Sequence, residues 1–179
     1  MALIFTLYAI VTVLSIFGGK LPTIFINRSG QNPYAARMKA MLIFAFFPLA
    51  VLLAQPLGME FAHLGRNAAW IPVLLISIGC AAHQAWSANL FSTIGDMFPQ
   101  GAIATVTGIG GMAGGIGSMI LQKGAGNLFV YAGETNMTFL NFEGKPAGYF
   151  IIFCICAVAY LIGWCIMKAL VPKYKLITD

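Results

Sequence analysis

The feature that most constrains this chain is a series of five long apolar runs with almost no charge inside them. They cover residues 2–26, 40–57, 70–94, 102–122 and 149–171. A helix rises about 1.5 Å per residue, so about 20 apolar residues cross the ~30 Å hydrocarbon core of a bilayer. The runs therefore predict an all-α membrane protein with five transmembrane helices.

The composition excludes the main alternatives. Of the 179 residues, 60% are hydrophobic and only 8% are charged, whereas a soluble domain carries about 25% charged residues. A water-soluble enzyme and a disordered tail are both excluded. The net charge of +5 would suggest nucleic acid as a partner of a soluble protein. Here the basic residues mostly lie between apolar runs, so we expect no nucleic-acid partner.

The basic residues predict the orientation in the membrane. With five crossings, seven of the ten fall on one side, namely Lys20, Arg28, Arg37, Lys39, Lys168, Lys173 and Lys175. Cytoplasmic loops of membrane proteins carry an excess of Lys and Arg. The first loop and the C-terminus are therefore expected in the cytoplasm and the N-terminus outside. Segments 58–69 and 123–148 become external loops.

The third run carries four polar residues near its middle: His83, Gln84, Ser87 and Asn89. Polar side chains at mid-membrane depth are costly and usually face a partner helix or a water-filled cavity. Amide and hydroxyl groups suit the hydroxyls and carboxylate of a sugar acid, so these four are candidate ligand contacts. The alternative is hydrogen bonding between helices without a ligand.

The fourth run is rich in glycine. Gly110 and Gly114, and likewise Gly111 and Gly115, are four residues apart, a spacing that lets two helix backbones approach closely in lipid. The same stretch formally contains a GxGxxA dinucleotide fingerprint, which we reject because it requires a preceding strand in a soluble βαβ unit. Two interpretations stay open: packing alone, or packing that also permits sliding or bending.

Enzymatic and metal chemistry find little support. The four cysteines lie inside apolar runs without a CxxC pair. His83 and His63 belong to different segments. The sequence has no HExxH motif, no paired mid-span carboxylates and no Ser-Lys pair. We therefore expect no catalytic site, no metal and no cofactor.

Two stretches carry a family resemblance. Arg28 and Gly30, with Arg37 further along, resemble the cytoplasmic loop motif G-x-x-x-D-R-x-G-R-R of the major facilitator superfamily, in the copy between spans eight and nine. The run HQAWSANLFSTIGDMFP, followed by GIGGMAGGIGSM, resembles bacterial hexuronate transporters of the anion:cation symporter branch. On this mapping the five runs correspond to spans eight to twelve of twelve.

The resemblance implies that residues 1–179 are part of the C-terminal six-helix half of a secondary transporter. Such a protein crosses the cell inner membrane several times and imports glucuronate or galacturonate with a cation, here expected to be a proton. The polar residues of the third run are then expected to contact the substrate, and the four glycines to lie at gating positions. The N-terminal half is expected to be a partner, on the same or a separate chain. The alternative is a small structural or regulatory membrane protein without transport activity.

Overall fold

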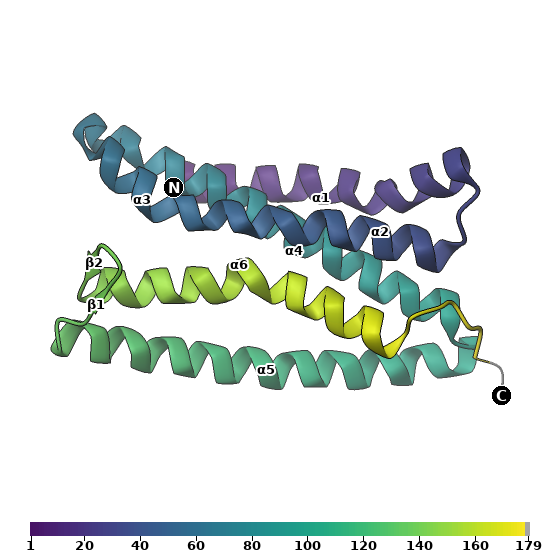
Figure 1. The fold of residues 1–179 in the computed structure, drawn as a ribbon. Helices are drawn as coiled ribbons and strands as arrows, with labels where there is room; N and C mark the ends of the chain where they lie inside the picture. Colours follow the sequence, from purple (N-terminus) through teal and green to yellow (C-terminus); the bar gives the residue numbers. More distant parts are fainter. Residues whose placement is uncertain (178–179) are drawn as a thin grey trace. The chain divides into compact units, whose positions relative to one another are not determined.

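A computed structural model describes residues 1–177 (Figure 1). Its elements, in chain order, are α1 (Ala2–Ser29), α2 (Pro33–Phe46), the 3-10 segment η1 (Phe47–Leu53), α3 (Ala54–Glu60), the 3-10 segment η2 (Phe61–Ala69), α4 (Trp70–Met97), α5 (Gln100–Glu134), strands β1 (Thr138–Phe139) and β2 (Phe142–Glu143), and α6 (Lys145–Leu170). The chain divides into two compact units. Unit 1 comprises Met1–Pro99 and Ala157–Asp179, and unit 2 comprises Gln100–Cys156.

Four helical stretches in the described part of the chain are long and apolar enough to cross a membrane. They are Ala2–Ser29, Pro33–Met97, Gln100–Glu134 and Lys145–Leu170. The protein is thus all-α apart from one short hairpin, as the apolar runs predict, and its long apolar helices are compatible with a membrane protein. The expected five crossings are seen as four stretches, because Pro33–Met97 holds two of the predicted runs in one helical tract.

The Pro33–Met97 stretch folds back on itself. The segment expected as an external loop, 58–69, is itself largely helical, and the backbone leaves helical angles at Gly65, with φ 58° and ψ −130°. A residue with a side chain rarely adopts these angles. As a result α2, η1 and α3 lie against α4 (Figure 1). The stretch therefore consists of two packed arms.

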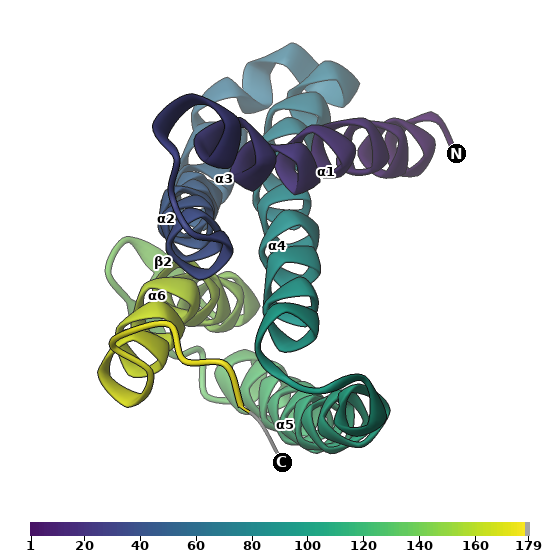
Figure 2. The ribbon, with the colours of Figure 1, turned by 90° about the vertical axis from the view of Figure 1, so that its right-hand side faces the viewer.

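The turn between α1 and α2 is built from local signals. Gly30 adopts the left-handed conformation, with φ 59°, and its N–H donates to the carbonyl of Ile26 at 3.0 Å. Asn32 then caps α2, because its Oδ1 accepts from the backbone N–H of Ala35 at 2.7 Å, and Pro33 occupies the first helical position. This sharp reversal lets α1 pack against both α2 and α4 (Figure 2).

Unit 1 has a sulfur-rich core near the ends of α2 and α4. Tyr34, Met38 and Met41 of α2 are buried together with Met97 of α4, and Trp164 packs against them. The C-terminal tail is bound to the same region, because the Tyr34 hydroxyl donates to the Val171 carbonyl. Residues distant in sequence thus pack together at one end of this unit.

In unit 2, segment 123–148 is not the extended external loop that the sequence predicts. Helix α5 continues past residue 122 to Glu134, and the rest of that segment forms the β1–β2 hairpin and the start of α6. The helix continues because its apolar end finds a partner: the rings of Phe129 and Tyr149 have centroids 4.3 Å apart. The hairpin packs through Phe142, whose ring centroid lies 4.6 Å from that of Phe150.

Candidate functional site

The polar residues of α4 lie at the midpoint of this helix. Helix α4 has 28 residues, and His83 and Gln84 occupy its centre, about 20 Å from either end at 1.5 Å per residue. Both residues are exposed, while Ser87 is partly buried. A long apolar helix therefore presents two polar side chains at its mid-length.

His83 faces α6. Its Nδ1 lies 2.5 Å from the hydroxyl of Tyr160, and the two ring centroids are 5.8 Å apart. Tyr160 also meets the edge of Trp86, with centroids 5.6 Å apart. All three residues belong to unit 1. Sequence reasoning did not select Tyr160, because a lone tyrosine inside an apolar run carries no signal of its own.

Asn89 lies on the other side of α4. Two residues turn an α-helix by about 200°, so Ser87 and Asn89 face opposite directions. Asn89 is only 1% exposed, its Nδ2 donates to the Ala85 carbonyl at 2.8 Å, and its buried Oδ1 finds no partner among the described residues. The structure therefore groups His83, Gln84 and Ser87 and separates Asn89 from them. Asn89 as a substrate contact stays a prediction.

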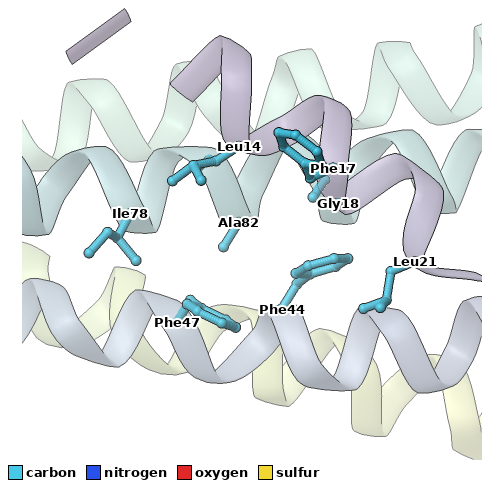
Figure 3. A pocket seen from close by; sticks show the side chains of 10 residues that line it. Leu14, Phe17, Gly18, Leu21, Phe44, Phe47, Ile78 and Ala82 are labelled. Carbon is cyan, nitrogen blue, oxygen red and sulfur yellow. The ribbon is translucent and has the colours of Figure 1, made fainter. Parts of the chain in front are cut away.

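An apolar pocket lies beside this helix, between α1, α2 and α4 (Figure 3). Its volume is about 440 Å³, and it is lined by Leu14, Phe17, Gly18, Leu21, Phe44, Phe47, Ile78, Ala81, Ala82 and Ala85. None of these lining residues has a polar side chain. A sugar acid would lose its hydrogen bonds to water there without replacement. The pocket is therefore unsuited to such a ligand.

The glycine face of α5 is open. Gly110, Gly111, Gly114 and Gly115 are all exposed. A Cβ added at any of them would meet no heavy atom within 4 Å in the part of the chain that the structure describes. The helix itself continues without interruption through these positions. Within unit 2 this face has no packing partner, so its packing or gating role stays a prediction.

The residues of the predicted cytoplasmic loop motif lie in different environments. Gly30 ends α1, and Arg28 is exposed. Arg37 forms an ion pair with Asp96, with Nε 2.5 Å from Oδ2 and Nη2 3.4 Å from Oδ1. The pair joins the start of α2 to the end of α4. Tyr174 of the tail adds to this cluster, because its hydroxyl donates to the Asp96 carbonyl at 3.2 Å.

No group of three or more metal-ligating side chains occurs within residues 1–177. Comparison of the chain with protein-family models, with curated proteins and with solved structures gave no match. Any assignment of function therefore depends on the chain's own residues and on the sequence resemblance.

Proposed function

We propose that this chain is the C-terminal part of a secondary active transporter that imports a hexuronate, or a related sugar acid, together with a cation, expected to be a proton. The observation that carries the proposal is the exposure of His83 and Gln84 at the midpoint of the long apolar helix α4. Transporters bind their substrates near the midplane of the bilayer. Polar side chains at that depth mark substrate or ion pathways.

The energetics favour a polar environment around these residues. An unsatisfied polar group in hydrocarbon is unfavourable by several kcal/mol, so the exposed Gln84 side chain requires water, a ligand or another polar helix. A hexuronate offers a carboxylate and several hydroxyls. The Gln84 amide can both donate to and accept from such groups, and His83 retains Nε2 because Nδ1 is directed to Tyr160.

The proposed mechanism is alternating access in the cell inner membrane. In this mechanism the chain crosses the membrane five times, with the N-terminus outside and the C-terminus in the cytoplasm. The fold-back of Pro33–Met97 supports two crossings within that stretch. An N-terminal half, on the same or a separate chain, supplies the opposite wall of the cavity, and the two halves rock around the bound substrate.

The open glycine face of α5 supports this mechanism and also a second candidate. In a transporter, small residues let the helix slide against the missing half. In a small structural or regulatory membrane protein, the same face pairs with another helix bundle without transport. Uptake of a sugar acid separates the two candidates.

The test is uptake of labelled glucuronate and galacturonate by membrane vesicles that contain the chain with an N-terminal half. We expect Gln84→Ala to lower uptake by about tenfold or more, because a hydrogen bond to a charged ligand contributes ~1.5–3 kcal/mol. The matched control is Ser92→Ala, about two turns further along α4, whose hydroxyl donates to the Ala88 carbonyl at 2.8 Å.

The control should retain nearly all of its uptake, and immunoblots should show equal amounts of both variants in the membrane. Undiminished uptake by Gln84→Ala would remove Gln84 from the site. Absence of uptake by the unaltered chain, with the partner half present, would favour the structural role.

A further inference from the structure

A second cavity lies at one end of unit 1, where α2 begins and α6 ends. Its volume is about 560 Å³, a size typical of small-molecule sites. Three lysines and three aromatic residues dominate its wall: Lys39, Lys168, Lys173, Tyr34, Trp164 and Tyr174. None of the described groups that line it is a carboxylate. The cavity is therefore strongly cationic.

The lysine donors are largely available to a ligand. Lys168 donates one proton of its ammonium group to the Pro172 carbonyl at 2.7 Å, which leaves two. The ammonium group of Lys39 lies 4.6 Å from the centroid of the Phe25 ring, a contact that uses no hydrogen bond. Lys173 is exposed. The nearby carboxylate of Asp96 is already paired with Arg37, so it does not neutralise the lysines.

The aromatic residues fix the wall of the cavity. Trp164 Nε1 donates to the Met38 carbonyl at 2.8 Å. The hydroxyls of Tyr34 and Tyr174 donate to backbone carbonyls as well. Their polar ends are thus engaged and their rings line the cavity. Trp and Tyr concentrate where a membrane meets water, and the cavity lies where apolar helices of spanning length end. In a bilayer that these helices span, the cavity would therefore lie at the depth of the lipid headgroups.

We propose that this cavity binds the phosphate of an anionic phospholipid of the phosphatidylglycerol class. Lysine is a good phosphate ligand as a point charge, and basic pockets between membrane helices bind anionic headgroups. Met38 and Leu42 also line the cavity, so an acyl chain can continue along apolar side chains. The proposal requires membrane insertion but does not depend on transport, so it can hold where the uptake test fails.

Trp164 provides a probe inside the cavity itself. The full chain, purified in detergent, is titrated with phosphatidylglycerol that carries bromine on its acyl chains, which quenches tryptophan fluorescence on contact. Trp70→Phe and Trp86→Phe leave Trp164 as the sole reporter. We expect quenching at far lower concentrations of brominated phosphatidylglycerol than of brominated phosphatidylcholine. Should these two substitutions unfold the chain, counting bound lipid on the unaltered chain by native mass spectrometry gives the same comparison.

A matched pair of triple variants separates the cavity from diffuse attraction. Each lysine near a headgroup contributes about fivefold in affinity, so removing three should weaken phosphatidylglycerol binding about a hundredfold. The cavity variant is Lys39→Gln, Lys168→Gln and Lys173→Gln. The control makes the same change in net charge at exposed residues that do not line the cavity: Lys20→Gln, Arg66→Gln and Lys123→Gln. We expect the control to bind within about twofold of the unaltered chain, since none of its three positions lines the cavity and exposed charges are screened by salt.

Three results would overturn the proposal. Equal losses in both triple variants would show diffuse charge attraction. Equal quenching by phosphatidylcholine would show that the phosphatidylglycerol headgroup is not selected. Full competition by inorganic phosphate or glycerol phosphate, at the lipid's own concentration, would show a site for a free phosphate.

Discussion

Gly18 tests the packing of α1 against α4. This residue is buried, and it lines the apolar pocket between α1, α2 and α4 (Figure 3). A Cβ added at Gly18 would collide with the Cβ of Ala85 and would lie 3.2 Å from Cζ of Phe44. At Gly19, the next residue, an added Cβ would meet no described atom within 4 Å. Gly18→Ala and Gly19→Ala therefore add the same methyl group in different surroundings.

The expected difference follows from two opposing effects. Alanine in place of glycine favours a helix by up to ~1 kcal/mol, and both variants share this gain. Overpacking opposes it by about 1–3 kcal/mol at Gly18 only. The two variants should thus differ by ~2 kcal/mol, which corresponds to about 4–8 °C in Tm for a chain of this size. Thermal unfolding in detergent, followed by tryptophan fluorescence, measures the difference.

A third variant checks the cause. Ala85→Gly removes the methyl group that Gly18→Ala would strike, so combining the two should recover most of the lost Tm, apart from the glycine's own helix penalty of ~1 kcal/mol. If Gly18→Ala unfolds at the same temperature as Gly19→Ala, α1 and α4 do not approach at this point. The packing argument for unit 1 would then be wrong.

Three further outcomes are expected, the first two measured by the same thermal unfolding assay. Arg37→Gln and Asp96→Asn should be less than additive, with a coupling energy of ~1 kcal/mol, because their ion pair is only 20–25% exposed; additive effects would exclude the pair. Tyr160→Phe should destabilise by ~1 kcal/mol through loss of the hydroxyl contact to His83, while Tyr160→Ala should destabilise at least twice as much through lost ring contacts; equal effects would contradict this. Phe142→Ala should destabilise unit 2 by ~3 kcal/mol or more, measured by hydrogen exchange across the hairpin; unchanged protection would show that the ring is not part of its core.

Much of the fold could be predicted from the apolar runs, because hydrocarbon length alone determines how long a spanning helix must be. The run 70–94 corresponds to α4, Trp70–Met97, nearly residue for residue. The extension of α5 to Glu134 could not be predicted in this way. Gln122 and Lys123 interrupt the apolar run, and the contact that sustains the helix joins Phe129 to Tyr149, which lie on either side of the β1–β2 hairpin in the sequence.

The sequence could indicate which polar residues α4 carries, but not which way each side chain points. A helix with one apolar stripe shows which face is buried, whereas α4 is apolar on nearly all sides and carries no such stripe. The sequence therefore could not indicate that His83 meets Tyr160, 77 residues away, or that Asn89 is turned inward. The pairing of Arg37 with Asp96 depends on the fold-back at Gly65 in the same way.

The bound tail has a mechanical consequence. Its contacts come one after another along the chain: Val171 with Tyr34, Tyr174 with Asp96, and the N–H of Ile177 with the Met97 carbonyl at 2.9 Å. Force applied to the C-terminus would load these bonds in series, so they would open singly, each worth only ~1 kcal/mol. A single-molecule pulling trace should therefore begin with small, low-force steps, one for each of these contacts.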